Sequence, residues 1–224
     1  APSAAAAEQR RSREIFAQPR CWAATLAISA SYSMMMLTMA PTPIVMRVVY
    51  GHPFDETTMV MMGHMVSMYA PSFITGSLVS RFGSTRALVA GCAVFVLSAA
   101  SLLASGSLAA FFVGLCLLGL GWNLLFVAGT AQLASCYRPA EGPKVQAVCD
   151  ALLALSSATS SLISAPLVDG IGWGWTQAVI IAVSLATCAV VLTGSALGAA
   201  AAHVSPQDGP QEGTGAPRPA SIGS

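Results

Sequence analysis

The chain has 224 residues, of which 55 % are hydrophobic and only 8 % are charged, and its formal net charge is +1. A water-soluble domain of this size carries roughly 25 % charged residues, so the composition excludes an ordinary soluble globular protein and indicates a surface that mostly faces lipid. The small net charge also excludes a field strong enough to recruit nucleic acid.

Six stretches of the sequence are long and apolar enough to form membrane-spanning helices. A helix needs about 20 mostly apolar residues to cross a hydrocarbon core about 30 Å thick. In chain order the stretches are 21–42, 57–80, 86–104, 108–136, 143–168 and 175–199. The connections are too short for folded domains. The sequence therefore predicts an all-α integral membrane protein, with one bundle of six transmembrane helices over residues 21–199 embedded in the lipid bilayer.

Two polar segments flank this bundle. Residues 1–20 form a basic leader, and a full-length spanning stretch follows it, unlike the short apolar region of a cleavable signal. Residues 200–224 are rich in Pro, Gly and Ser and are predicted to be a disordered tail. The sequence does not begin with methionine, and we expect it to be part of a longer protein.

Lysine and arginine are distributed unequally between the two sides of the bundle. The leader, the connections after the second and fourth stretches, and the tail hold nine: Arg10, Arg11, Arg13, Arg20, Arg81, Arg86, Arg138, Lys144 and Arg218. The alternate connections hold only Arg47. Because short cytoplasmic loops carry the excess of basic residues, we predict that the leader and the tail are both cytoplasmic.

Strongly polar side chains are concentrated in four of the six stretches, since the interior of the third has none stronger than serine and the sixth has only Gln177. In those four they are Tyr32 in the first, His64 in the second, Asn123 and Gln132 in the fourth, and Gln146 and Asp150 in the fifth. A polar side chain in hydrocarbon is costly, so we expect these four helices to line the interior or a wet cavity. The third and sixth helices are then lipid-facing supports.

Small residues and prolines predict how the helices pack and bend. Gly114, Gly121 and Ala128 recur every seven residues, so they share one face of the fourth helix and should let a neighbouring helix approach closely. Pro71 removes a backbone donor inside the second helix and should bend it, and Pro166 does the same near the end of the fifth.

No metal or cofactor site is predicted. The six cysteines form no C-x-x-C pair and no zinc-like spacing with histidine, so we expect free thiols. All ten methionines lie between Met34 and Met68, and several flank His64, which is a ligand set that suits Cu(I). We favour the alternative, in which methionine fills space in adaptable helix interfaces.

The connection after the second stretch carries a motif. From Gly76 to Arg86 it reads GSLVSRFGSTR, which resembles the loop signature G-x-L-x-D-R-x-G-R-[RK] of the major facilitator superfamily. The resemblance implies a cytoplasmic gating loop whose matching residues are Gly76, Arg81, Gly83 and Arg86. Ser80 stands where the family has Asp, and Ser84 where it has a basic residue, so the family's Asp-centred charge network is incomplete here. The alternative is an ordinary basic loop.

Three longer segments extend the resemblance to about residues 15–199. GLGWNLLFVAGTAQLASCYRP (119–139) and KVQAVCD (144–150) resemble the tenth and eleventh helices of bacterial facilitators, and HMVSMYAPSFITG (64–76) resembles the eighth. A weaker loop motif is typical of the second half of these proteins.

The resemblance implies a fold and a function. The chain would be the C-terminal six-helix half of a 12-helix transporter in a bacterial inner membrane. That transporter would move a small-molecule substrate by alternating access, as a proton-coupled or uniporting carrier. The partner of this half would be an N-terminal half of the same chain or a second copy.

In such a carrier the polar side chains named above become candidates for the substrate and proton pathway. Asp150 lies about 10 Å into the fifth helix, at 1.5 Å per residue. It could be a protonatable gate or coupling site, paired with Arg81, Arg86 or Arg138. Its alternative role is an interfacial acid that fixes helix packing.

The other candidates also have two roles each. Asn123 lies near the middle of the fourth helix, at the depth where such folds bind substrate, and its alternative is a hydrogen bond between helices. For His64 we favour a neutral histidine bonded to a neighbouring helix over a group that titrates during transport. Tyr32, Gln132 and Gln146 are weaker candidates of the same kind as Asn123.

An intramembrane enzyme and a scaffold are the two alternatives to a transporter. An intramembrane serine protease needs an activated serine and a histidine on a facing helix. His64 is the only histidine inside a predicted helix of the bundle and no helix contains G-x-S-G, so we do not expect an enzyme. A non-transporting scaffold or assembly subunit stays open as the alternative to transport.

Overall fold

The computed structural model describes residues 10–204, with side chains for residues 10–200, and this part of the chain contains helices and no strand. The α-helices are α1 (Ser12–Phe16), α2 (Pro19–Met39), α3 (Thr42–Ile44), α4 (Phe54–Tyr69), α5 (Ser72–Phe82), α6 (Ser84–Ala104), α7 (Leu108–Ala134), α8 (Gly142–Ile171) and α9 (Trp173–Val204). A π-helical turn, Val45–Val49, follows α3, and a 3-10 turn, Pro139–Glu141, precedes α8. The predicted all-α fold is therefore confirmed.

Five helical segments of the described chain are long and apolar enough to cross a membrane. They are Pro19–Val49, Ser84–Ala104, Leu108–Ala134, Pro139–Ile171 and Trp173–Ala200. Hydropathy identifies them because each places about 20 or more mostly apolar residues in one helical stretch. These segments correspond to five of the six predicted stretches.

The remaining stretch, predicted as one helix over 57–80, is two helices. α4 ends at Tyr69, Ala70 and Pro71 form a turn, and α5 begins at Ser72. Pro71 has no N–H to donate, and its ring collides with the preceding turn of an α-helix, so it interrupts the helix that hydropathy alone joins. Pro166, by contrast, lies inside α8, and that helix continues to Ile171.

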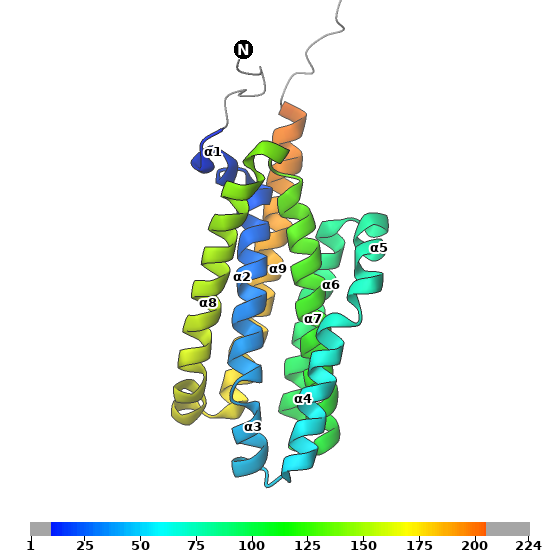
Figure 1. The fold of residues 1–224 in the computed structure, drawn as a ribbon, viewed down its shortest axis with the longest axis vertical. Coiled ribbons are helices and arrows are strands. Elements are labelled where there is room, and N and C mark those ends of the chain that lie inside the picture. Colours follow the sequence, from blue (N-terminus) through cyan, green and yellow to red (C-terminus); the bar gives the residue numbers. More distant parts are fainter. Residues whose placement is uncertain (1–9, 205–224) are drawn as a thin grey trace, which may run out of the picture.

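The helices form two layers (Figure 1). α8, α2, α7 and α4 lie side by side in the front layer, and α5 continues from α4. α9 packs against α2, and α6 packs against both α7 and α9, so these two helices form the rear layer. The rear helices are the third and sixth predicted helices, and the front layer carries all six candidate pathway residues, whereas α9 of the rear layer holds the buried Gln177.

Glycines allow α6 and α7 to pack closely, as the seven-residue repeat predicts. A Cβ atom added at Gly114 would lie 2.6 Å from Cγ of Leu102, and one added at Gly121 would lie 3.0 Å from the Phe95 ring. Ala128, the third member of the repeat, is buried. Only a residue without a bulky side chain fits at these positions, so α7 occupies the middle of the bundle.

Most basic residues of the described chain lie at one end of the bundle. α1, the α5–α6 and α7–α8 connections and the C-terminal end of α9 lie toward the upper end in Figure 1, and α3 and the start of α4 lie at the other end. Arg47 is in the π-helical turn, at that second end. The cytoplasmic assignment of the basic end stays a prediction.

The last helix extends a few residues past its predicted end. α9 continues to Val204, beyond the predicted boundary at residue 200, because an alanine-rich segment favours helix. Residues 1–9 and 205–224, which include much of the predicted leader and tail, lie outside the described residues.

Candidate functional site

A cleft opens on the front layer, where α7 and α8 both pack against α2. Its volume is about 260 Å³. Its lining residues come from all three helices and the α7–α8 connection: Ile28, Phe126, Thr130, Leu133, Tyr137, Gln146, Cys149, Asp150 and Leu153. The cleft thus combines an apolar floor with a carboxylate, an amide, a phenol and a hydroxyl.

Two predicted site residues, Gln146 and Asp150, lie one turn apart on α8 and both line this cleft. Both side chains are exposed, and Gln146 Nε2 donates to the Tyr137 hydroxyl at 3.2 Å. The cleft therefore offers hydrogen-bonding groups from α8 to a molecule that enters it.

The expected ion pair of Asp150 is absent. Within residues 10–204 the ion pairs are Arg10–Glu141 and His52–Glu56, so Asp150 is not paired with Arg81, Arg86 or Arg138. Arg81, Arg86 and Arg138 are exposed and lie on other elements. The Asp150 carboxylate faces the cleft without a cation.

An aromatic cluster adjoins the cleft. The rings of Trp122 and Phe126 stack on α7, with centroids 5.2 Å apart and planes at 5°, and Phe126 also lines the cleft. Tyr32, another predicted site residue, meets both rings edge-on, at 5.2 and 5.8 Å. Tyr69 of α4 meets Trp122 edge-on at 6.1 Å and is 61 % exposed. Flat rings therefore stand beside the polar groups of the cleft.

Asn123 does not face the cleft but the α4–α5 side of α7. Its Nδ2 donates to the Met68 carbonyl at 2.8 Å and to Ser72 Oγ at 2.6 Å, and its Oδ1 accepts from Thr75 Oγ1 at 2.7 Å. The side chain is 1 % exposed. In this conformation the geometry is that of the alternative role, an interhelical hydrogen bond.

Gln132 and His64 are also buried and bonded between helices. Gln132 Nε2 donates to the Arg20 carbonyl, and its Oε1 accepts from Ser84 Oγ, both at 3.2 Å. Nδ1 of His64 donates to the Leu115 carbonyl at 2.8 Å, because a carbonyl can only accept. Of the six predicted site residues, the structure thus brings Gln146, Asp150 and Tyr32 to the cleft and its aromatic rim.

The predicted gating loop is mostly helical: Gly76 and Arg81 lie in α5, Arg86 lies in α6, and Gly83 alone separates the two helices. Gly83 has a φ of +87°, a left-handed conformation that glycine adopts without strain. Arg81 and Arg86 are exposed, and the Arg81 guanidinium lies 5.5 Å from the Phe82 ring. A Cβ at Gly76 would have nothing within 4 Å, so close packing inside this chain does not require that glycine.

Two polar contacts at the ends of the bundle were not predicted from the sequence. Glu141, which is 2 % exposed, accepts hydrogen bonds from the Arg10 side chain at 2.7 and 3.0 Å and from the Arg138 backbone at 2.9 Å. At the other end His52 bonds Glu56 and the Gly106 carbonyl, each at 2.8 Å. The only signal in the sequence was an acid within a basic connection and a histidine four residues before an acid.

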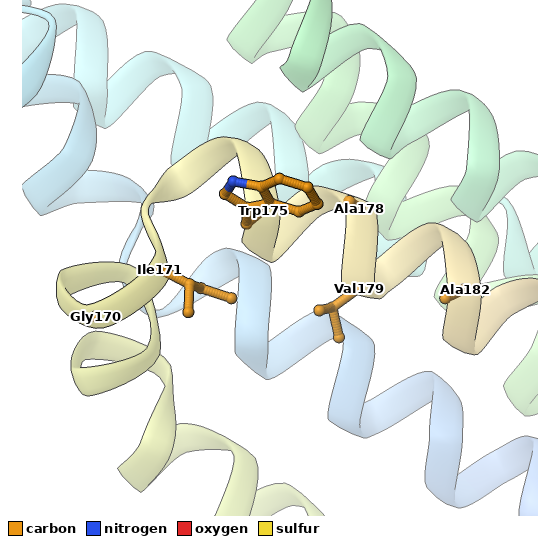
Figure 2. A pocket seen from close by; sticks show the side chains of 6 residues that line it. All are labelled: Gly170, Ile171, Trp175, Ala178, Val179 and Ala182. Carbon is orange, nitrogen blue, oxygen red and sulfur yellow. The ribbon is translucent and has the colours of Figure 1, made fainter.

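A larger hollow, of about 610 Å³, lies at the junction of α8 and α9. Figure 2 shows its lining residues, Gly170, Ile171, Trp175, Ala178, Val179 and Ala182. Among these side chains only that of Trp175 has a polar atom. Such a surface suits lipid chains and cannot orient a polar solute.

Within the described residues, no three His, Cys, Asp or Glu side chains are grouped so that they could hold a metal ion. The six cysteines are free thiols. The cleft is therefore the part of the structure that combines concave shape with convergent polar groups, the usual features of a small-molecule site.

Comparison with known proteins places this geometry in a family. The model of the Major Facilitator Superfamily matches residues 12–221. The chain is 34 % identical over 160 residues to the riboflavin transporter RfnT of Brucella anthropi. The aligned segment covers 71 % of this chain and 40 % of that protein. The chain is 37 % identical over 145 residues to the uncharacterized MFS-type transporter YdeG of Bacillus subtilis, over 61 % of this chain and 32 % of that protein.

The chain spans less than half the length of these curated relatives. The family match nevertheless extends over most of the chain, and the helical bundle supplies the membrane-spanning segments that such a protein needs. This chain belongs to the Major Facilitator Superfamily, a family of membrane transporters and not of enzymes.

Proposed function

We propose that this chain is the C-terminal half of a bacterial cell-membrane transporter that moves a small solute by alternating access. In this architecture the solute site lies near the midplane between two halves, and one half rocks against the other. The two-layer arrangement supports the proposal, because the rear helices α6 and α9 brace a front layer that carries the cleft and the aromatic cluster.

In this proposal the chain crosses the membrane six times, and α4 and α5 together form the second crossing. α4 has 16 residues and α5 has 11. At a rise of 1.5 Å per residue, the two in series measure about 40 Å, which exceeds the hydrocarbon thickness of about 30 Å. Both pack against α7, so they follow one path through the bundle.

The observation that carries the proposal is the Asp150 carboxylate in the cleft. An ionisable side chain within a membrane-spanning helix is costly, and it usually marks a pathway for substrate or protons. Here the carboxylate is exposed to the cleft, and no cation of the described chain pairs with it. We infer that Asp150 binds either the solute or the coupling proton.

The rings beside Asp150 favour a planar aromatic solute that also donates hydrogen bonds. Tyr32 and Phe126 are only partly buried, so they offer ring surface, while Gln146 and Asp150 offer polar atoms. A related protein is a riboflavin transporter, and riboflavin combines a flat heteroaromatic ring with a chain of hydroxyl groups. Riboflavin is therefore the first solute to test.

The test is uptake of riboflavin by liposomes that contain the longer protein to which this chain belongs. Asp150→Asn should lower uphill uptake at least about tenfold, since a hydrogen bond to a charged group contributes about 1.5–3 kcal/mol. Membrane insertion should be unchanged. Asp169→Asn is the matched control, because Asp169 lies on the same helix and does not line the cleft.

The outcomes separate the alternatives. Normal uphill uptake by Asp150→Asn would reduce Asp150 to a residue that fixes packing. Transport of other solutes but not of riboflavin would support the transporter function and show that riboflavin is not its solute. The absence of any solute-dependent flux in the unchanged protein would favour a scaffold.

A further inference from the structure

α5 is a short helix with a backbone interruption at each end. At its start, Ala70 and Pro71 form the turn that separates it from α4. At its end, Gly83 has a φ of +87°. An interruption of either kind lets the flanking helices change direction with few broken backbone hydrogen bonds. α5 can therefore move as a unit relative to α4 and α6.

The two helices flanking Pro71 differ in how firmly they hold to α7. α4 lies so close to α7 that a Cβ at Gly119 would be 2.8 Å from the His64 carbonyl oxygen and 3.0 Å from the Met68 nitrogen. His64 adds a buried hydrogen bond to the Leu115 carbonyl at 2.8 Å. α4 is thus fixed to α7 by backbone proximity and by a polar contact.

α5 has little of this packing. Thr75 and Val79 are its buried residues, while Phe73 is 91 % and Ile74 is 69 % exposed. A Cβ at Gly76 would meet nothing within 4 Å. Apolar contacts inside the described chain therefore hold α5 only along a narrow stripe.

The polar contacts of α5 converge on Asn123 of α7. Asn123 Nδ2 donates to the Met68 carbonyl, in the last turn of α4, and to Ser72 Oγ, the first residue of α5. Thr75 Oγ1 lies 2.7 Å from Asn123 Oδ1 and 2.9 Å from the Pro71 carbonyl, and it shares its proton between them. One buried amide thus joins α7 to both sides of the break.

A second amide of α7 acts at the other end of α5. Gln132 Oε1 accepts from Ser84 Oγ at 3.2 Å, directly after Gly83. Gln132 Nε2 donates to the Arg20 carbonyl, so this contact also involves the start of α2. Gln132 therefore anchors the α6 side of the Gly83 interruption, whereas Asn123 bonds α5 itself.

We propose that α5 is a gate segment of the crossing and that Asn123 is the positioning residue that pins its hinge at Pro71. When the Asn123 bonds to Ser72 and Thr75 break, α5 swings while α4 stays on α7. The movement of α5 is a property of this chain alone, and only its role in transport rests on the proposed function.

Hydrogen exchange of the backbone amides in the longer protein, held in detergent or nanodiscs, measures the hinge directly. Asn123→Leu keeps the side-chain size and removes the amide. Exchange in segment 72–82 should rise roughly thirtyfold, because net contributions of about 1 kcal/mol for each of the two hydrogen bonds between Asn123 and α5 are lost. Exchange in segment 54–69 should rise much less, because α4 loses one bond at Met68 but keeps the His64 bond to Leu115 and its close backbone packing at Gly119. Thr193→Val is the control, since the Thr193 hydroxyl bonds only carbonyls of its own helix α9 and Thr193 does not line the cleft.

A second pair of variants covers the case in which Asn123→Leu does not fold. Thr75→Val removes the hydroxyl that bonds Asn123 and keeps the shape of the side chain, so it should raise exchange in 72–82. Thr75→Ser keeps the hydroxyl and should restore the original exchange. Unchanged exchange in 72–82, or an equal rise in 54–69, would overturn the hinge.

Uptake kinetics on the same variants separate the gate from a solute contact. A gate residue changes the maximal uptake rate with KM nearly constant, whereas a solute contact raises KM and leaves exchange unaltered. A raised KM with unaltered exchange would indicate that Asn123 contacts the solute, and it would contradict the proposal. The exchange experiment needs no solute, so its result stands whether or not the protein transports riboflavin.

Discussion

At the scale of single residues, His52 shows how one side chain ties two connections at the end of the bundle opposite the basic residues. Its Nδ1 lies 2.8 Å from Glu56, and its Nε2 lies 2.8 Å from the Gly106 carbonyl. Both partners accept, so both ring nitrogens must carry protons. The Gly106 carbonyl and the Glu56 carboxylate accordingly raise the pKa of His52 above its ordinary value of 6.5. The imidazole ring also packs edge-on against Phe111.

This contact predicts a pH-dependent stability. A raised pKa in the folded state means that the contribution is complete below the unfolded pKa, about 6.5, and is lost as pH rises through the raised folded value. The unfolding midpoint in detergent should therefore fall by about 2 °C over that window, which corresponds to roughly 0.5–1 kcal/mol for a chain of this size. His52→Gln, which does not titrate, should flatten the dependence. A full pH dependence in His52→Gln would show that other groups cause it.

At the scale of elements, hydropathy located five helices because each has a long apolar stretch, whereas it merged α4 and α5. Averaged hydropathy does not register Pro71, which breaks the helix by removing one N–H.

The shared cleft position of Gln146 and Asp150 follows from their four-residue spacing. The partners of Asn123 could not be predicted, since they depend on how α7 is rotated against α4. The Arg10–Glu141 pair joins residues 131 apart in sequence, and no local pattern specifies it.

The glycines of the bundle give a prediction at this scale. Gly114→Ala should destabilise the contact between α6 and α7 by about 1–3 kcal/mol, because the new Cβ would lie 2.6 Å from Leu102. Gly76→Ala is the matched control, since its Cβ meets nothing within 4 Å, and alanine favours a helix interior by about 0.5–1 kcal/mol. Thermal unfolding of the two variants checks the difference. Equal destabilisation by both would argue against close packing at Gly114.

At the scale of the whole molecule, the front layer leaves polar groups for a second half to cover. Asn123 and Gln132 need no such cover, because they are buried and bonded within this chain. Thr130, Gln146 and Asp150 are exposed polar side chains of the cleft. Leaving strongly polar groups in hydrocarbon costs a few kcal/mol each. A lone chain should therefore insert but pair with an N-terminal half or with itself.

Flux through the reconstituted chain decides whether this bundle is half of a transporter. The purified chain is placed in liposomes alone and together with the proposed N-terminal half, and riboflavin uptake and oligomeric mass are measured in both. We expect the monomeric chain to insert without uptake, and we expect uptake once the second half, or a second copy, is present. Uptake by a strictly monomeric chain would contradict this expectation.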